Sequence, residues 1–281
     1  MADEQMKSTA ELDAINPEVW SSAWYPTLLE NLVMMDSVAM DYQGEMNGRG
    51  DRVNITTFPQ FGTAVDLAEG SRVDAAALEP TGQQLVVNHE IAQDFIITQK
   101  AIIQTLEAQE KLREHAFFSI MKKIDQILLN DIAPSTAAPD HITSYASGTT
   151  LALADILDAF EALNTANVPD VGQRVAVLGV AQHADLFNIS GFVSRDYSPT
   201  TNALTSGSIS TPVMGFRVKF SSMVSSVSTF LSPEFMQVAV QQNPVPKVFD
   251  LGSLGIRAFR TNMTVLFGNK QCSNLRVYQK A

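Results

Sequence analysis

Apolar and polar residues alternate along two segments of this chain, which a polar stretch separates. The first segment runs from Arg52 to Phe58. The second runs from Gln84 to Ile97 and places five apolar side chains on one face: Leu85, Val87, Ile91, Phe95 and Ile97. Alternation with a period of two residues is the pattern of a β-strand with one buried face. The sequence therefore predicts a long hairpin, whose return strand would reach roughly 45 Å, further than a compact domain of this size needs.

The connection between the two strands, residues 59–82, is polar and contains few large apolar side chains. It carries four acidic residues: Asp66, Glu69, Asp74 and Glu79. Long connections of this kind are usually either functional or mobile. We therefore expect an exposed, acidic tip at the end of the hairpin.

A long helix is predicted to follow the return strand directly, from Thr98 to the residue before Pro134. Thr98 is a good N-cap, and about 35 helical residues would span roughly 52 Å. Apolar residues recur near the helical period along it: Ile102, Ile103, Leu106, Leu112, Phe117, Ile120, Met121, Ile124, Ile127 and Leu128. The repeat is not sustained as heptads, which disfavours a coiled coil. A long hairpin that leads into a very long helix suits a subunit that reaches over its neighbours.

The N-terminal region has two parts. Residues 1–16 are polar and predict a mobile arm. Residues 17–42 show helical spacing of large apolar side chains, and Pro26 favours two short helices over one. The stretch Gly48–Asp51 then predicts a turn.

The second half of the chain mixes helical and strand patterns, which is typical of an α/β domain. Two helices are predicted, at Leu151–Asn164 and Gln182–Phe187. Residues 188–211 are rich in Ser, Thr, Asn and Gly and predict a loop, as does the stretch from Pro134 to Gly148. Strands are predicted at Arg174–Gly179, Pro212–Phe220, Thr229–Gln241, Gly255–Phe267 and Asn274–Gln279, the last two joined by a turn at residues 268–270.

Composition narrows the class of protein. The chain has 281 residues, 45% of them hydrophobic, so a sizeable core can be buried and global disorder is excluded. Its formal net charge of -11 disfavours binding of nucleic acid through the average surface, because such binding depends on Lys and Arg. The single cysteine, Cys272, cannot form an internal disulfide. We find no signal-peptide pattern and no apolar run long enough for a membrane span, and we expect a reducing, aqueous compartment.

The sequence contains no strong catalytic signature, such as a phosphate-binding glycine loop, a G-x-S-x-G motif, an H-E-x-x-H motif or paired cysteines. His183 and Asp185 lie two positions apart, but the local pattern is the start of a helix, and ordinary surface roles are the better interpretation. The pair Asp140 and His141 lies in a proline-flanked loop, where a structural role again dominates. Catalytic residues, cofactors and metal ligands are therefore not expected.

Other candidates are weaker still. His89 and His115 stand alone, and isolated histidines are rarely ligands. Asp125 and Asp131 are six residues apart on the predicted helix and would not share a face well, so we do not pair them. The tripeptide Arg49-Gly50-Asp51 matches a cell-adhesion motif, but three residues match by chance often, and a turn is the better interpretation.

The order of these elements resembles the HK97-fold major capsid proteins of tailed phages. The resemblance covers nearly the whole chain. The segments that are similar to the family are Pro17–Trp20, Asp41–Glu45, Gly50–Ile55, Leu85–Ile97 with the helix that follows it, and Asn262–Leu266.

The resemblance implies an α+β fold with a defined set of parts. These are an N-terminal arm with short helices at 1–42, an extended loop at 43–97, an axial domain at 149–250, and a peripheral domain that combines 98–148, with the long spine helix, and the closing strands at 251–281. The implied function is that of a major capsid protein, which assembles as hexamers and pentamers into an icosahedral head around double-stranded DNA. Net negative charge fits a shell that holds DNA without binding it tightly.

The resemblance also implies partners and a location. A portal protein and a possible decoration protein are expected, and, since only residues 1–16 precede Pro17, we expect a separate scaffolding protein. The protein would be assembled in the host bacterial cytoplasm, become part of the virion capsid and have no membrane partner. Two alternatives stay open: an encapsulin-like shell that encloses a cargo enzyme, and an α/β enzyme, for which no polar constellation is found.

Overall fold

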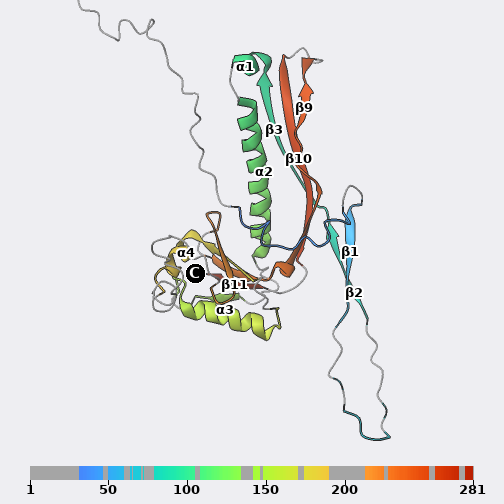
Figure 1. Ribbon diagram of the computed structural model, residues 1–281, viewed down its shortest axis with the longest axis vertical. Helices are drawn as coiled ribbons and strands as arrows, with labels where there is room; N and C mark the ends of the chain where they lie inside the picture. The colour runs from blue at the N-terminus through green and yellow to red at the C-terminus, as the bar shows by residue number, and fades with distance from the viewer. Residues whose placement is uncertain are drawn as a thin grey trace, which may run out of the picture.

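A long helix lies along a four-stranded sheet and forms the spine of the molecule (Figure 1). The computed structural model describes residues 32–46, 50–59, 64, 66–70, 72, 79–104, 108–133, 142–145, 148–169, 174–189, 213–224, 227–252, 257–271 and 276–280. The helix is α2 (Ala108–Ile132), and the sheet contains β3 (His89–Thr98), β10 (Ala258–Gln271), β8 (Met236–Gln242) and β9 (Lys247–Asp250). All three partners of β10 run antiparallel to it.

Helix α2 packs on the sheet through a ridge of side chains spaced four residues apart: Ala116, Ile120, Ile124, Leu128 and Ile132. The facing side chains on β10 are Met263, Val265 and Phe267, which alternate along the strand and are buried. Spacing of four keeps the ridge on one side of the helix. The predicted apolar stripe is therefore confirmed at Ile120, Ile124 and Leu128, but it is wrong at Leu112 and Phe117, which are exposed.

A second layer forms at one end of the spine. Its five-stranded sheet has the order β4 (Ile142–Ser144), β11 (Arg276–Lys280), β7 (Val227–Leu231), β5 (Val175–Gly179) and β6 (Arg217–Ser221). Helices α3 (Leu153–Thr165) and α4 (Val180–Leu186) belong to this part of the chain. Their apolar faces and the sheet share one closed core, in which Phe216 and Phe230 stack edge to face at 5.0 Å between ring centroids.

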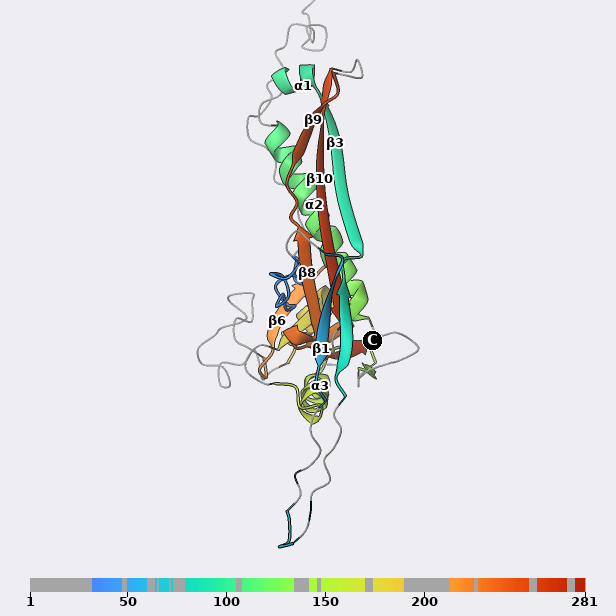
Figure 2. The ribbon, with the colours of Figure 1, turned by 90° about the vertical axis from the view of Figure 1, so that its right-hand side faces the viewer.

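The third part is a hairpin that leaves the body of the molecule (Figure 2). Strands β1 (Arg52–Thr57) and β2 (Thr81–Val86) pair antiparallel and in register, from the pair Arg52 and Val86 to the pair Thr57 and Thr81. The mixed helices and sheets agree with the α+β class that the resemblance implies.

The predicted return strand of the hairpin is interrupted in the structure. It forms two strands, β2 and β3, which belong to different sheets. The predicted helix is described as α1 (Gln99–Gln104) and α2, and residues 105–107 between them lie outside the described residues. Its predicted cap is confirmed, because the N–H of Ala101 donates to Oγ1 of Thr98 at 3.3 Å.

Several further predictions were wrong. The described part of the predicted N-terminal helices, residues 32–42, forms turns. The predicted strand at 229–241 is divided by the 3-10 turn Pro233–Phe235 into β7 and β8. The final strands do not pair with each other, because β10 pairs with β3, β8 and β9 while β11 pairs with β4 and β7. Strand β4 lies in a predicted loop, and β9 was not predicted.

Other predictions of local structure are confirmed. Helix α3, strand β5 and helix α4 lie within a few residues of their predicted positions. Within the loop predicted at 188–211, only 188 and 189 are described. Residues 1–31, which contain the predicted arm and the first predicted helix, lie outside the described residues.

Candidate assembly surfaces

The hairpin β1–β2 has only a small core of its own. Its inward face is held at the base by Ile55 and Leu85, which pack with Met46 and with Ala239 of β8. Further out, Phe58 is 73% exposed. A two-stranded hairpin is marginally stable at best in water. The described outer end of β1 therefore leaves a large apolar side chain open to water.

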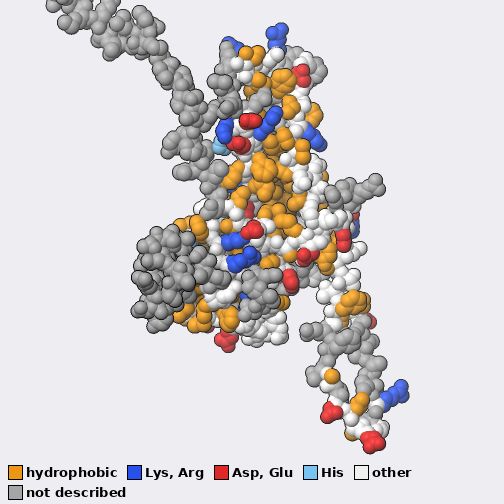
Figure 3. Space-filling model, in the orientation of Figure 1, with side chains coloured by type: hydrophobic (Ala, Val, Ile, Leu, Met, Phe, Trp, Pro, Cys, Tyr) orange, Lys and Arg blue, Asp and Glu red, His pale blue; other side chains and the backbone are white. Residues whose placement is uncertain are grey.

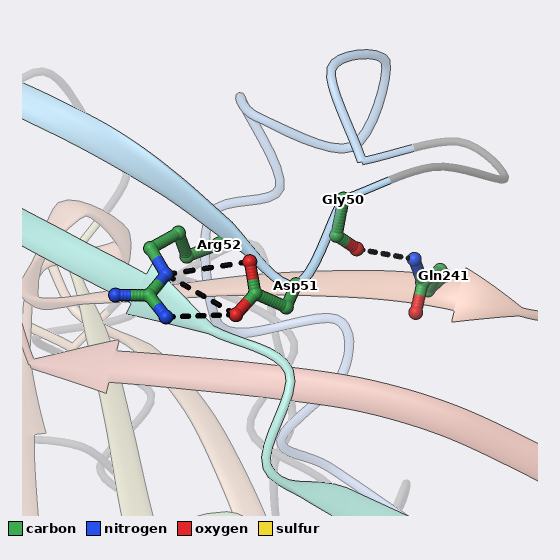
Figure 4. Close-up of polar contacts among 4 residues, drawn as sticks. All are labelled: Gly50, Asp51, Arg52 and Gln241. Atoms are coloured by element: carbon green, nitrogen blue, oxygen red, sulfur yellow. Dashed lines mark hydrogen bonds and ion pairs between the residues drawn. The ribbon is translucent and has the colours of Figure 1, made fainter.

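Polar contacts fix the base of the hairpin to the body (Figure 4). Nε2 of Gln241 donates to the backbone carbonyl of Gly50 at 2.7 Å. The N–H of Val87 donates to the carbonyl of Asp51 at 2.9 Å, and the carboxylate of Asp51 pairs with the guanidinium of Arg52 at 2.8 Å. Gly50 has a φ of +87°, a backbone conformation that glycine adopts without strain. The hairpin therefore leaves the body in a defined direction.

Gly268 marks the place where the hairpin connection crosses β10. A Cβ atom at this position would lie 2.2 Å from the backbone carbonyl oxygen of Val86 and 3.0 Å from the Cα of Val87. Only a glycine allows two backbones to approach this closely. The glycine that predicted a turn at 268–270 therefore lies inside a continuous strand and serves a close crossing.

The described residues at the tip of the hairpin are exposed, and they include acidic side chains and the cation Arg72. Asp66, Leu67 and Glu69 are all exposed, with Leu67 at 46% of its full surface, and Glu79 is exposed on the return side. Gly70 follows with a φ of +86°. An apolar side chain between two carboxylates is a surface that can combine burial with ion pairing.

A cationic groove lies at the opposite end of the molecule, where α1 begins (Figure 1). It has a volume of about 320 Å³ and is lined by Thr98, Gln99, Lys100, Ile103 and Arg257. The N–H of Gln99 donates to the carbonyl of Arg257 at 3.0 Å, which holds the two cationic segments side by side. Ile103 is 76% exposed. Among the described residues, Lys100 and Arg257 have no ion-pair partner.

A second groove lies along α2 and is mainly apolar. Its volume is about 380 Å³. It is lined by residues of α2, β8 and β10, of the entering segment (residues 33–37) and of the chain that follows β8: Met35, Phe117, Met121, Ile124, Val240, Asn243, Pro244 and Val265. Figure 3 shows apolar side chains gathered along this face of the spine. Phe117 is 45% exposed here. A contiguous group of apolar side chains that is open to water is typical of an interaction surface.

The sheet face away from α2 carries a polar cluster centred on Asp94 of β3. Arg260 and Asn262 of β10 both donate to its carboxylate, Arg260 through Nε at 3.0 Å. The hydrogen bond from Arg260 is the main reason that the pKa of Asp94 lies below its usual range. This cluster ties the two long strands together at the surface.

Asp125 of α2 is fully buried and binds the chain that leads into the body. Its Oδ1 accepts the backbone N–H groups of Met34 at 2.7 Å and Val33 at 3.1 Å, while its Oδ2 is buried and has no hydrogen-bond partner among the described residues. Burial raises the pKa of Asp125, against the opposing effect of those hydrogen bonds and of Lys219. The sequence pattern assigned Asp125 no role. The only signal was an acidic residue beside the apolar positions Ile124 and Leu128.

The same entering segment is held from its other side. Nζ of Lys219 on β6 pairs with the carboxylate of Asp36, and this hydrogen bond is the main cause of the lowered pKa of Asp36. The hydroxyl of Ser37 donates to the carbonyl of Val33 at 2.5 Å. The spine helix and the five-stranded sheet therefore both form polar contacts with one short segment, residues 33–37.

The described histidine and aspartate residues that the sequence analysis considered as catalytic or metal-binding candidates do not form a common site. His183 stacks on Phe220 with 4.6 Å between ring centroids, and burial lowers its pKa. Asp185 instead accepts the N–H of Leu151 at 3.0 Å. His89 stacks on the buried Phe267.

The remaining candidates also occupy separate places. His115 is exposed on α2. Asp131 accepts a hydrogen bond from Asn269 of β10, away from the backbone groups that Asp125 binds. Arg49, Asp140, His141 and Cys272 lie outside the described residues. Within the described part of the chain, no three His, Cys, Asp or Glu side chains are grouped so that they could hold a metal ion, and no helix is long and apolar enough to cross a membrane.

The architecture is shared with solved phage structures. A chain from Mycobacterium phage Che8 matches with a TM-score of 0.74 and 21% identity, over 94% of this chain and 96% of that one. The capsid structure of Cyanophage P-SCSP1u matches with a TM-score of 0.76 and 11% identity, over 96% and 94% of the two chains. The capsid asymmetric unit of Cyanophage Pam1 matches with a TM-score of 0.70 and 14% identity, over 100% and 99%. The fold is thus the HK97-like fold of phage capsids.

The sequence itself matches a family. A model described as phage capsid protein matches residues 45–242, which is more than half of the chain. The chain belongs to the phage capsid protein family, and it is the major capsid protein of a bacteriophage, a structural component of the virion. No curated protein matches the sequence. The family match supports the phage shell over the encapsulin-like alternative.

Proposed function

We propose that copies of this chain assemble as hexamers and pentamers into a closed icosahedral shell that encloses double-stranded phage DNA. The hairpin is the observation that carries the proposal. It leaves the body in a fixed direction, and among its described residues the apolar contacts with the body lie at its base, so it is built to lie on an adjacent copy. The acidic composition supports a shell that does not bind DNA tightly.

Each part of the chain would then have its own role in assembly. The extended loop, 43–97, would reach over the neighbouring copy, with β3 joining it to the spine. The peripheral domain, 98–148 with 251–281, would contain the spine helix and the long strand β10. The axial domain, 149–250, would meet its equivalents around each hexamer or pentamer, and residues 1–42 would act as the arm.

The proposal includes partners and a place of assembly. A separate scaffolding protein would guide closure, a portal would occupy one vertex, and a decoration protein could bind the finished shell. Assembly would take place in the host bacterial cytoplasm. The proposed role is structural, as the phage capsid family suggests.

Imaging tests the proposal directly. The full chain would be expressed with the scaffolding protein of its own genome, and the product examined by negative-stain electron microscopy and light scattering. We expect closed particles of uniform size. A stable, monodisperse monomer under these conditions would contradict the proposal.

A further inference from the structure

The spine and the five-stranded sheet share one apolar core, and the segment that enters the body lies in it. Val175 and Val177 of β5 and Leu231 of β7 are buried in the same cluster as the ridge of α2. Val33 and Met34 are buried in that cluster too. Figure 1 shows the described start of the chain passing the end of α2, next to the five-stranded sheet. The entering segment therefore lies between the two layers and contacts both.

A short turn joins the two layers covalently, and the entering segment is bound to it. Strand β7 belongs to the five-stranded sheet and β8 to the sheet of the spine, with Ser232 and the 3-10 turn Pro233–Phe235 between them. The N–H of Ala39 donates to the carbonyl of Pro233 at 3.0 Å, and the carbonyl of Ala39 accepts the N–H of Val238 at 3.0 Å. A rotation of one layer against the other at this turn would therefore disturb the contacts of the segment.

Polar side chains hold the same segment from both layers. On the spine side, Oδ1 of Asp125 accepts the N–H groups of Val33 and Met34. On the other side, Nζ of Lys219 on β6 pairs with the carboxylate of Asp36. The contact with Asp125 is buried, whereas the side chain of Asp36 is 83% exposed. The second contact can therefore be altered without a change in the core.

We infer that residues 33–39 act as a strap that fixes the angle between the spine and the five-stranded sheet, and that this angle sets the curvature of the shell. The inference rests on the proposed shell and assigns the strap a role in its size. A shell closes only when the rotation between copies is defined, so a subunit whose layers rotate freely would form shells of several sizes. The strap is bound to α2, β6 and β8, and a change of angle must break at least one of these contacts.

Reversing the charge of Asp36 tests the strap at its exposed contact. Asp36→Lys would bring two ammonium groups together and separate the segment from β6, whereas Asp36→Glu keeps the ion pair. Each full-length variant would be expressed with the scaffolding protein, and particle diameters measured by negative-stain electron microscopy. We expect Asp36→Lys to shift the particles from a single diameter to a mixture of diameters, because like charges repel. Asp36→Glu should leave the diameter unchanged.

Glu114→Lys is the matched control. Glu114 is exposed and pairs with Lys111 at 2.8 Å, so this variant makes the same change in net charge and breaks an ion pair that lies within α2. It should leave the particle diameter unchanged, because it does not touch the strap.

Hydrogen exchange in subunits expressed without the scaffolding protein tests the strap independently of the shell. In Asp36→Lys the amides of Ala39 and Val238 should exchange about tenfold faster, because the strap opens locally. The melting temperature should change by no more than about 4 °C, since an exposed ion pair contributes little to global stability. Asp125→Leu removes the acceptor on the spine side and should have the same effect on exchange, whereas Asp125→Asn keeps an oxygen acceptor and should not.

The outcomes separate this inference from the proposed function. Particles of a single diameter from Asp36→Lys, or unchanged exchange at Ala39 and Val238 in that variant, would overturn the strap and leave the proposed shell standing. Mixed diameters from Glu114→Lys would also overturn it, because net charge and not the strap would then set the size. An unaltered chain that forms no particles would overturn the proposed function, and the inference with it.

Discussion

The five-stranded sheet and the hairpin are both made of β-strands, but they are stabilised in different ways. The sheet with α3 and α4 closes around its own core, in which Phe216, Phe230 and Leu178 are almost fully buried. The hairpin buries little beyond Ile55 and Leu85 at its base. The first region therefore buries its apolar groups within one chain, and the second leaves Phe58 open to water.

The difference in core packing between the sheet and the hairpin separates the effects of mutations on folding from their effects on assembly. A region with a closed core is ordered before it meets another copy, because the burial of apolar side chains offsets the loss of chain entropy. A region without a closed core gains order only when it contacts another copy. Mutations should therefore lower the stability of the monomer when they fall in the body, and lower the yield of particles when they fall in the outer hairpin.

The largest effect is expected from a charge in the ridge of α2. Ile120→Asp should prevent folding, because it buries an unpaired carboxylate in the core, at a cost of several kcal/mol. Phe117→Asp, three residues away on the exposed groove, should fold and instead lower particle yield. Soluble expression and thermal melting would measure the first effect, and particle counts the second. A soluble Ile120→Asp protein with normal melting would show that the buried face of the helix is misplaced.

Next in size is a pair of truncations that compares the two regions directly. Phe230→Ala in the five-stranded sheet should lower the global free energy of unfolding by about 3–5 kcal/mol. Leu85→Ala should instead open the hairpin locally and change the global value by less than about 1 kcal/mol. Urea denaturation gives the global values, and native-state hydrogen exchange reports on hairpin amides. Equal global effects from the two truncations would mean that the hairpin folds as part of the body.

A smaller, pH-dependent effect is expected at Asp125. Its pKa in the folded protein is raised above 3.8, mainly by burial, so the folded protein binds the proton more tightly than the unfolded chain. The contribution of this group to stability is fully present below about pH 3.8 and is lost as the pH rises through the raised pKa. Tenfold tighter binding of the proton by the folded protein would correspond to about 1.4 kcal/mol.

The variant Asp125→Asn cannot titrate at this position and therefore serves as the reference for the natural chain. The free energy of unfolding of the natural chain, relative to the variant, should fall as the pH rises through that window and then become constant. Chemical denaturation of both proteins over a pH series would measure it. A difference that grows with pH would show that the N–H groups of Val33 and Met34, with Lys219, outweigh burial.

The smallest effect on stability is expected at the hairpin tip. Replacing residues 63–80 by a short Gly-Ser link removes the exposed side chains of Asp66, Leu67 and Glu69 and leaves both strands of the hairpin whole. The free energy of unfolding should change by no more than about 0.5 kcal/mol. Particle yield should nevertheless fall sharply. Normal particles from this deletion would contradict the role of the tip, and a collapsed circular dichroism spectrum would contradict the independence of the body.

The sequence predicted elements whose signal is local. Three such predictions are confirmed: the alternation in β1 and β3, the cap at Thr98 and the buried run in β5. Each depends only on residues that are close to one another in the sequence. The α+β class and the family follow from the order of such elements. Helix α2 was found for the same reason.

The tertiary structure decided what depends on partners distant in sequence. Val87 and Asn88 look like part of one strand, but the sheet order assigns β2 and β3 to different sheets. Gly268 resembles a turn residue until the backbone of Val86 is placed against it. Asp125 looks like a surface acid until the N–H groups of Val33 and Met34, more than ninety residues away, bind it.

The same limit applies to the assembly surfaces. Phe117 and Ile120 are both apolar and lie one turn apart, and periodicity alone predicts that both are buried. Which of them faces the sheet depends on the angle at which α2 meets β10, and only the packed molecule sets that angle. The sequence by itself determined that this chain has a long hairpin and a long helix. The tertiary structure decided which of their side chains are left for another copy, because exposure depends on every segment that packs nearby.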